Sequence, residues 1–398
     1  MAGMQKSIPN IALIANGRGA HARSFCEGAA DDIRNRCGWK LRLLLRDDLR
    51  PTTSLRAFDG VIVRDIGERE YDLICKLGIP VVEAAVKGTG SSRFASVDCD
   101  EKELSALAAR HFLERGFTEF AFCGYRGVSF SDIREHHFNA AVAAAGFEVR
   151  NFPEQGAAFA EKTVEDAEPD ETNLDLWVRS LPKGTGVFCA NDLLAHKLLA
   201  VCQAGRLRIP QDIAILGADN DFLLCNINEP TLSSISLNAY GIGAGAARLL
   251  ERILAGEIPG DVGSVHESVP PGRLKTRDST AIYRFGPPWL SDALVYIDRN
   301  AAKISAADVC HSVRKSHTAV DTAFAEFLHT SVQKRITSVK MDEALRLLED
   351  GNDRISDIAE RLGFPSVQYF GNVFKLMFNA TPAAYRKEKR GLKNHSKG

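Results

Sequence analysis

Long hydrophobic runs, paired cysteine motifs and a strong net charge are all missing from this 398-residue sequence. No run of 18 apolar residues occurs, so no membrane-spanning helix is expected. The nine cysteines are scattered and never form CxxC, which predicts buried thiols in a reducing compartment and no metal site. Because Lys6 precedes only a short strand-like stretch, we expect no signal peptide and a cytoplasmic location.

Motifs of catalysis are missing as well. GxxxxGK[ST], HExxH and GxSxG do not occur. The segment GIGAGAAR (241–248) contains GxGxxA, with Asp261 twenty residues after the first glycine, and superficially fits dinucleotide binding. The preceding SSISLNAY is polar rather than a buried strand, so we expect no nucleotide, no other cofactor and no enzyme activity. An α/β enzyme fused to DNA-binding helices stays open as an alternative that turnover of a bound ligand would reveal.

Two short helices with a tight corner are predicted over residues 354–375. Gly363 ends the first helix, Pro365 prevents its continuation, and Ser366 caps the second. The apolar positions of the first helix follow a 3.6-residue period: Ile355, Ile358, Ala359 and Leu362. Those expected to face inward on the second are Val367, Phe370, Val373 and Phe374. The outward positions are then Gln368, Asn372 and Lys375, with Tyr369 at the margin. Side-chain amides read base edges, and lysine binds phosphates.

Residues 304–328 repeat this pattern. A helix runs through Val309 to Val313, a corner follows, and Ser316 caps a second helix with Val320, Phe324 and Phe327 inward. A further helix is predicted over residues 339–350. The two hairpins are therefore copies of one DNA-reading unit joined by a long helix. An ordinary helical hairpin with a merely solvated polar face is the alternative for either copy taken alone.

The second unit and the stretch after it resemble the DNA-binding domain of the AraC/XylS family. The family signature I..IA..GF....F...FK....TP..YR is matched by Ile355, Ile358, Ala359, Gly363, Phe364, Phe370, Phe374, Lys375, Thr381, Pro382, Tyr385 and Arg386. The resemblance covers roughly residues 290–390 and implies an all-α domain with two recognition helices, about one turn of duplex apart. The implied DNA contacts are His317, Thr318, Asp321, Thr322, Val367, Gln368, Tyr369 and Asn372, with Lys375 on phosphate.

The first unit departs from the family where members often present arginine or glutamine. This chain has Asp321 and Thr322 there. An aspartate near phosphates weakens binding unless it accepts a hydrogen bond from cytosine N4. We therefore expect the second unit to contribute more base readout, mainly through Gln368 and Asn372. Gly371 is unusual inside a helix, and a close approach to DNA or to the first helix would explain it.

The net charge of −1 hides an uneven distribution. From Trp289 onward there are 17 lysines and arginines against 13 acidic residues, whereas the rest of the chain has 33 against 38. The basic excess lies in the part predicted to bind DNA.

Residues up to about 285 alternate short apolar runs with helix-period segments, which is typical of parallel sheets covered by helices. The predicted strands lie at 10–16, 60–65, 80–85, 119–125, 186–192 and 213–219. The length suits two such lobes. The paired prolines of FGPPWL predict a linker, so we divide the chain into a two-lobe sensing domain (1–285), a linker (286–290) and a DNA-binding domain (291–398).

Several sequence segments in the first domain resemble the periplasmic-binding-protein-like sensor of the LacI/GalR regulators. The segment GVFCANDLLAHKLLAVCQAGRLRIPQDIAILGADN and the later EPTLSSI match that family's pattern. Fusion of such a sensor to a C-terminal AraC-type domain resembles the xylose operon regulator family. The resemblance implies a two-lobe clamp on a sugar, with ligand contacts from Phe130, Arg134, Asn191 and Asp219. Asp192 is expected to cap the following helix, and Asn16, Arg23 and Asp98 are further candidates.

These resemblances imply a ligand-responsive, sequence-specific transcription regulator that controls sugar catabolism. D-Xylose or a related pentose is the expected effector, and double-stranded DNA and a second copy of the chain are the expected partners. A non-pentose or non-sugar effector in the same architecture is the alternative, which pocket polarity would decide.

Overall fold

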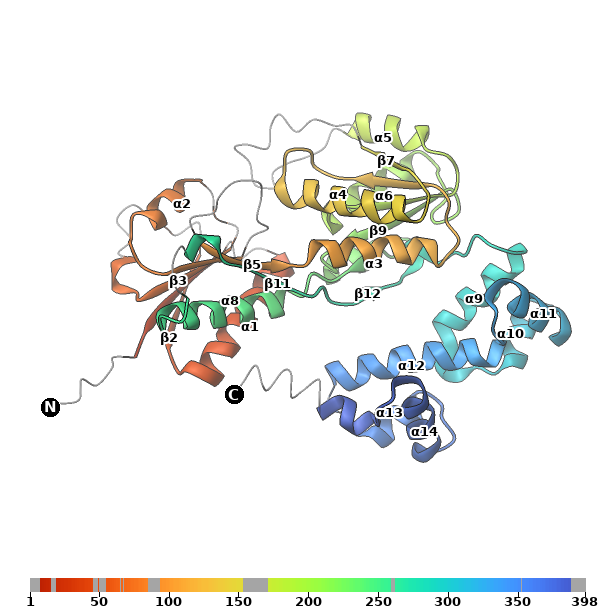
Figure 1. Cartoon of the computed structure of the whole chain (residues 1–398). Coiled ribbons are helices and arrows are strands. Elements are labelled where there is room, and N and C mark those ends of the chain that lie inside the picture. The colour runs from red at the N-terminus through yellow and green to blue at the C-terminus, as the bar shows by residue number, and fades with distance from the viewer. Residues whose placement is uncertain are drawn as a thin grey trace. The chain divides into compact units, whose positions relative to one another are not determined.

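The computed structural model of the chain divides into two units, Met1–Ala281 and Ile282–Gly398 (Figure 1). It describes residues 8–15, 19–45, 49, 55–64, 66, 68–84, 94–152, 171–258, 262–351 and 353–387. Unit 1 contains two six-stranded sheets, which we call lobe 1 and lobe 2. In the described residues no helix is long and apolar enough to cross a membrane.

The sheet of lobe 1 is parallel throughout, in the order β11-β5-β4-β3-β1-β2. Its central strands are apolar and almost fully buried, as expected for a sheet with helices on both faces. The strands are β1 (Asn10–Ala15), β2 (Lys40–Leu45), β3 (Gly60–Arg64), β4 (Val81–Ala84), β5 (Ala95–Cys99) and β11 (His266–Val269). Its helical elements are α1 (Gly19–Asp32), η1 (Ile33–Cys37), η3 (Leu55–Ala57), α2 (Glu68–Cys75), α8 (Ala239–Leu254) and η4 (Val262–Ser264).

Lobe 2 has the sheet order β12-β10-β9-β8-β6-β7, and only β12 is antiparallel to its neighbour. Its strands are β6 (Phe120–Cys123), β7 (Val149–Asn151), β8 (Thr185–Cys189), β9 (Ile213–Ala218), β10 (Ser233–Ile235) and β12 (Leu274–Lys275). Its helices are α3 (Glu101–Leu113), α4 (Ser129–Ala144), α5 (Glu171–Ser180), α6 (Asp192–Ala204), α7 (Phe222–Ile227) and η5 (Asp278–Thr280). The six predicted strand segments correspond to β1, β3, β4, β6, β8 and β9.

In the part of the chain that the structure describes, three crossings join the lobes, after β5, after β10 and after β11. The crossings are hydrogen-bonded to one another. The Asp100 amide donates to the Val269 carbonyl at 2.8 Å, and the Gly272 amide donates to the Ser236 carbonyl at 2.8 Å. Three short, mutually bonded crossings form a hinge about which two otherwise self-contained sheets can move.

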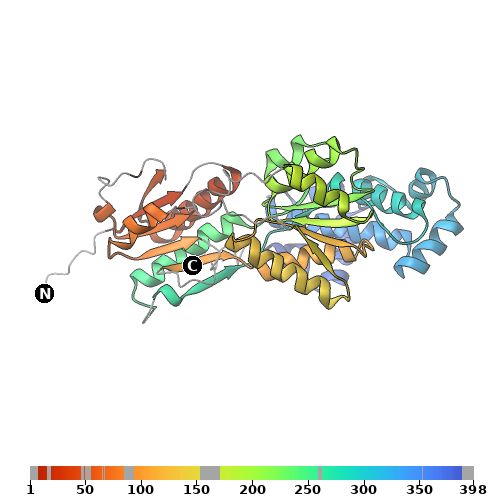
Figure 2. The same cartoon turned by 90° about the horizontal axis from the view of Figure 1, so that it is seen from above.

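The small-residue segment that resembled a nucleotide loop is the middle of helix α8. A Cβ atom added at Gly243 would lie 2.0 Å from the Phe25 carbonyl oxygen of α1, so the glycine allows these two helices to pack closely. Figure 2 shows the green helix α8 among the red and orange elements of lobe 1.

The segment before α8 was expected not to be a buried strand, and this expectation was wrong. Ser233–Ile235 is the buried strand β10, because its serines find hydrogen-bond partners inside lobe 2. The glycines lie within a helix and present no phosphate-binding loop.

Unit 2 is all helical, with α9 (Pro288–Asn300), η6 (Ala301–Lys303), α10 (Ala306–Ser312), α11 (His317–Leu328), α12 (Val332–Asp350), α13 (Ile355–Arg361) and α14 (Val367–Phe378). Helix α9 begins inside the predicted linker 286–290. Proline is well tolerated at the first helical position because no intrahelical partner is needed there, so Pro288 starts the helix instead of breaking it. Leu290, also inside that range, is fully buried.

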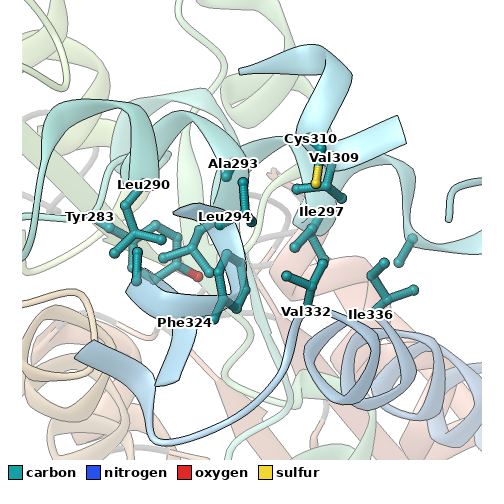
Figure 3. Packing of buried hydrophobic residues seen from close by; sticks show 13 residues of the cluster. Tyr283, Leu290, Ala293, Leu294, Ile297, Val309, Cys310, Phe324, Val332 and Ile336 are labelled. Carbon is teal, nitrogen blue, oxygen red and sulfur yellow. The ribbon is translucent and has the colours of Figure 1, made fainter. Parts of the chain in front are cut away.

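Two hydrophobic clusters form the core of unit 2, and α12 contributes to both. Its first half supplies Val332 and Ile336 to the cluster with Leu294 and Phe324, which Figure 3 shows. Its second half supplies buried residues such as Leu348 to the cluster with Phe370. Figure 1 shows α9 to α11 at one end of α12 and α13 and α14 at the other. The 19-residue helix is about 28 Å long at 1.5 Å per residue.

The predicted helix boundaries of the two hairpins are confirmed. Ser316 and Ser366 each accept a hydrogen bond from the amide three residues on, and Gly363 has a φ of 67° at the corner. Two inward assignments were wrong, because Phe327 is 38% and Val367 45% exposed. Both lie toward a helix end, where the neighbouring helices no longer cover the apolar face. The helix predicted over 339–350 begins earlier, at Val332.

Candidate functional site

A buried ion pair fixes one side of the candidate ligand site, beside the hinge. Arg134 on α4 is 1% exposed and donates to the Glu101 carboxylate through Nε at 2.7 Å and Nη2 at 2.6 Å. Its Nη1 donates to the Ala190 carbonyl after β8. Arg134 was predicted to contact the ligand. In the structure three of its N–H donors tie α3, α4 and the end of β8 together.

Two aromatic residues lie next to this ion pair. The Phe130 ring is partly buried, with the Arg134 guanidinium carbon 5.4 Å from its centroid and the Tyr125 ring 6.5 Å away. The Tyr125 hydroxyl donates to Asn191 Oδ1 at 3.4 Å. These rings and the Asn191 amide form a mixed apolar and polar wall, which suits the apolar face and the hydroxyl edge of a sugar.

Asn191 is the N-cap of α6, and the assignment of that role to Asp192 was wrong. Asn191 has the extended backbone that an N-cap requires, and its Oδ1 accepts from the Leu194 amide at 2.9 Å. Asp192 is the first helical residue and is fully buried. It accepts hydrogen bonds from Ser234 Oγ at 2.6 Å and from the Asp221 amide at 2.8 Å. Burial raises the pKa of the Asp192 carboxyl to about 7, despite these hydrogen bonds.

Asp219 and His21 face each other from the two lobes. Asp219 follows β9 in lobe 2, and His21 is near the start of α1 in lobe 1. His21 Nδ1 lies 3.9 Å from Asp219 Oδ1, which is too long for a hydrogen bond. His21 Nε2 is buried and finds no partner among the described residues. A polar ligand between the lobes would satisfy His21 Nε2, which the described residues leave without a hydrogen bond.

Burial shifts the titration of both Asp219 and His21 toward their neutral forms. Burial, and then the Asp192 carboxyl, raise the pKa of Asp219 well above its usual range, although Arg134 and Arg64 oppose this. Burial and the same two arginines lower the pKa of His21. Burial also raises the pKa of nearby Asp98 to about 6. The carboxyl groups of Asp219 and Asp98 and the imidazole of His21 are therefore shifted toward their neutral forms, beside the Arg134–Glu101 ion pair.

The four predicted ligand residues lie in one region of unit 1. Phe130 stacks beside Arg134, Asn191 bonds Tyr125, and the charge of Arg134 acts on Asp219. Their role in ligand binding stays a prediction. The further candidate Arg23 is exposed, and Asn16 lies outside the described residues. The residues missed were His21, Arg64, Glu101 and Tyr125.

We expect Asp219→Asn to stabilise the ligand-free protein and to weaken effector binding strongly. A buried group with a raised pKa stabilises the fold fully only at low pH, and that contribution is lost as the pH rises through the folded-state pKa. Asparagine removes this cost and tolerates the φ of 117° at this position. Thermal unfolding should show a gain that grows as the pH rises above about 4, reaching about 2–4 °C for roughly 1 kcal/mol. A destabilised Asp219→Asn protein would contradict the assigned electrostatics.

The predicted reading face of the second unit is an exposed stripe on α14. Gln368, Tyr369, Asn372 and Lys375 are all exposed, as is Val367 at the start of the helix. Phe370 and Phe374 on the opposite face are fully buried. The helix is therefore held by its apolar side while an unoccupied polar side with two amides and one lysine faces outward, as a recognition helix requires.

Helix α11 repeats this arrangement in the first unit. Val320 and Phe324 are fully buried and Ala323 nearly so, whereas the four predicted contacts His317, Thr318, Asp321 and Thr322 are exposed. Asp321 adds an acidic side chain to this stripe. As DNA contacts, these positions and those on α14 remain predictions.

Gly371 lies beside open space. A Cβ atom added there would have no neighbour within 4 Å among the described residues outside its own helix backbone. The suggested close approach to the first helix of the unit is therefore wrong. Gly371→Ala should stabilise unit 2 by about 1 kcal/mol through helix propensity. It should also weaken DNA binding several-fold, since the new methyl group lies one turn from both Gln368 and Lys375. Unchanged affinity in a gel-shift titration would show that DNA does not approach this position closely.

Two domain families match the sequence, each in one unit of the structure. A periplasmic binding protein-like domain matches residues 109–280, and a helix-turn-helix domain matches residues 309–388. The chain is 26% identical over 393 residues to the xylose operon regulatory protein of Haemophilus influenzae, covering 96% of this chain and 99% of the relative. The protein of the same name from Escherichia coli K12 is 28% identical, with coverages of 94% and 96%. The chain is a DNA-binding transcription regulator.

Solved structures agree with this architecture for the regulator. The structure of a xylose-binding transcription activator matches with a TM-score of 0.59 and 26% identity, covering 96% of the regulator and 99% of that chain. A periplasmic binding protein/LacI transcriptional regulator from Alkaliphilus metalliredigens matches with a TM-score of 0.53 and 19% identity, over 68% of the regulator and 99% of that chain. The second match shows the fold of the two-lobe part alone. The expected fold class, a two-lobe sensor followed by a double helix-turn-helix domain, is confirmed.

Proposed function

We propose that the regulator senses a pentose, with D-xylose as the first candidate, and controls genes for its catabolism. The observation that carries this proposal is the likeness to xylose operon regulatory proteins along nearly the whole chain. The interlobe region supports it: Asn191, Tyr125 and Asp219 supply hydrogen-bonding groups, and Phe130 supplies a ring for the apolar face of a sugar.

Effector binding and DNA binding belong to different parts of the chain in this proposal. We assign sensing to residues 1–285 and DNA binding to residues 291–398, with base contacts from α11 and α14. Closure of the lobes on the sugar changes DNA affinity. The energy for this change comes from the difference in sugar affinity between the open and closed lobes.

Calorimetric titration of the full chain tests the effector. We would titrate D-xylose first, then L-arabinose, D-ribose, D-glucose and L-fucose. Micromolar binding of one pentose, with much weaker binding of the hexoses, is the expected result. If none of the five sugars bound, the result would count against a sugar effector and leave the DNA-binding function intact. Recovery of the bound sugar chemically unchanged would separate this regulator from an enzyme.

We further propose that the regulator acts as a homodimer in the cytoplasm, where its DNA lies. The DNA-binding part has only a small basic excess, and phosphate neutralisation is the main source of DNA affinity, so one copy alone should bind weakly. Light scattering coupled to size-exclusion chromatography measures the mass directly. A monomer at micromolar concentration that binds operator DNA tightly would contradict this part of the proposal.

A further inference from the structure

The last residues of unit 1 are anchored firmly inside lobe 2. We call residues 276–280 the exit segment, because unit 2 begins two residues later, at Ile282. Ser279 and Thr280 are fully buried. Ser279 Oγ donates to the Ile215 carbonyl of β9 at 2.6 Å, and Thr280 Oγ1 lies 2.7 Å from Ser233 Oγ of β10. The exit segment therefore moves with the sheet of lobe 2.

One rigid helix contacts both the candidate effector site and the exit segment. Helix α3 begins with Glu101, the partner of Arg134 in the effector site. At its other end His111 Nε2 lies 2.9 Å from Thr280 Oγ1, and Arg115 donates to Thr276 Oγ1 at 3.4 Å just beyond the helix. The 13 residues of α3 span about 20 Å. A helix transmits displacement along its axis with little loss, since its own hydrogen bonds resist bending.

A second connection joins the same two places. Arg277 Nη2 donates to Asn220 Oδ1 at 2.8 Å, and Arg277 Nη1 donates to the Leu232 carbonyl at 2.7 Å. Asn220 directly follows Asp219, and both residues have positive φ, 52° and 117°. Successive residues in this sparsely populated region hold their conformation only while their surroundings enforce it. A ligand that engages Asp219 acts on this turn and thereby on Arg277.

The start of unit 2 is anchored equally firmly on its own side. Tyr283 is 8% exposed and packs in the cluster with Leu290 (Figure 3). Its hydroxyl group donates to Asp298 at 2.8 Å and accepts from Arg335 at 3.0 Å. Only Ala281 and Ile282 separate this anchor from Thr280. Three Cα–Cα steps join the two anchors and span at most about 11 Å, so they leave little slack between them.

We propose that the exit segment carries the effector signal from the sensor to the DNA-binding unit, with α3 and the Arg277–Asn220 contact as its two links to the effector site. His111, Thr280 and Arg277 are positioning residues in this device: they touch neither effector nor DNA. The inference rests on the proposed function and adds its route of regulation. These residues determine how strongly sugar binding changes DNA affinity, which we call the coupling. They do not determine the affinity for the sugar or for DNA alone.

The test compares the full-length wild type with Thr280→Val and Arg277→Lys. D-Xylose affinity is measured by calorimetry, and DNA affinity by fluorescence anisotropy on a duplex selected by the wild type from a random-sequence library. The matched control is Thr185→Val, which removes an equally buried hydroxyl group whose 2.7 Å bond to the Pro182 carbonyl reaches no part of the exit segment. Insertion of Gly-Gly between Ala281 and Ile282 serves as a third variant that removes no buried contact.

The expected result is a loss of coupling without a loss of binding. Wild type and Thr185→Val should change their DNA affinity at least about fivefold when D-xylose is added, within the usual range for allosteric proteins. In the other three variants this change should fall below about twofold, while D-xylose affinity stays within about twofold of wild type. Full coupling in the Gly-Gly insertion and in either substitution would overturn the inference. A wild type that binds no sugar would instead overturn the proposed function.

Discussion

Replacing Arg134 by alanine is expected to cost about 3–5 kcal/mol of unfolding free energy and to abolish effector binding. Its carboxylate partner Glu101 is only 6% exposed and would be left buried without a counter-ion. The Ala190 carbonyl would lose its donor at the same time. Urea unfolding followed by circular dichroism measures the loss. Calorimetry with D-xylose at low temperature, where the variant stays folded, measures the effector site.

A surface ion pair in the same lobe is the matched control. Arg150 pairs with Glu119, and their side chains are 50% and 37% exposed. Arg150→Ala should therefore change the stability by less than about 1 kcal/mol. If Arg134→Ala were as stable as this control and lost only sugar binding, Arg134 would be a ligand donor that does not hold the lobe together, as the sequence first indicated.

Substitutions on α14 are expected to separate base readout from phosphate contact. Gln368→Ala and Asn372→Ala should each cost about 1–3 kcal/mol of discrimination between operator and non-operator DNA, because an amide pairs bidentately with adenine. Lys375→Ala should weaken binding to all sequences alike and lower the slope of log affinity against log salt by about one. Anisotropy titrations at several salt concentrations on both duplexes give the two quantities.

Thr318→Ala on α11 is the control for this series, since the first unit is expected to contribute less readout. It should change discrimination less than either α14 amide does. Equal effects from Gln368, Asn372 and Lys375 would show that the stripe on α14 is not the reading face. A larger effect from Thr318→Ala would show that the first unit contributes more base readout than the second.

Much of the fold follows from local patterns in the sequence. Apolar runs located the central strands of both sheets, and Ser316, Gly363 and Ser366 fixed the helix boundaries because caps and corners depend on neighbouring residues alone. Strands β2, β5, β7, β10, β11 and β12 were not among the six predicted segments. Strand β10 is rich in serine, and its burial depends on partners such as Asp192 and Thr280, 42 and 47 residues away. Strand β11 joins the lobe 1 sheet beside β5, about 170 residues earlier in the chain.

The candidate site was predictable where a strand ends and unpredictable where two distant side chains meet. Asn191 and Asp219 follow apolar runs, at the edge where parallel sheets bind ligands. The same rule would have pointed to Arg64 at the end of β3 and Tyr125 just after β6. Nothing local indicates that Glu101 neutralises Arg134, 33 residues later. The sequence thus identified Arg134 by family resemblance, and only the packing of α3 on α4 showed its structural role.

The shared helix α12 limits how this protein can diversify. Each residue added to a helix turns everything beyond it by about 100° and moves it 1.5 Å along the axis. A single insertion in the middle of α12 would turn α14 by about 100° relative to α11, although both hairpins would still fold. Under the proposed DNA contacts, side-chain changes on either stripe alter which operator is read. A change of one residue in the length of α12 would instead turn the two stripes out of register with each other.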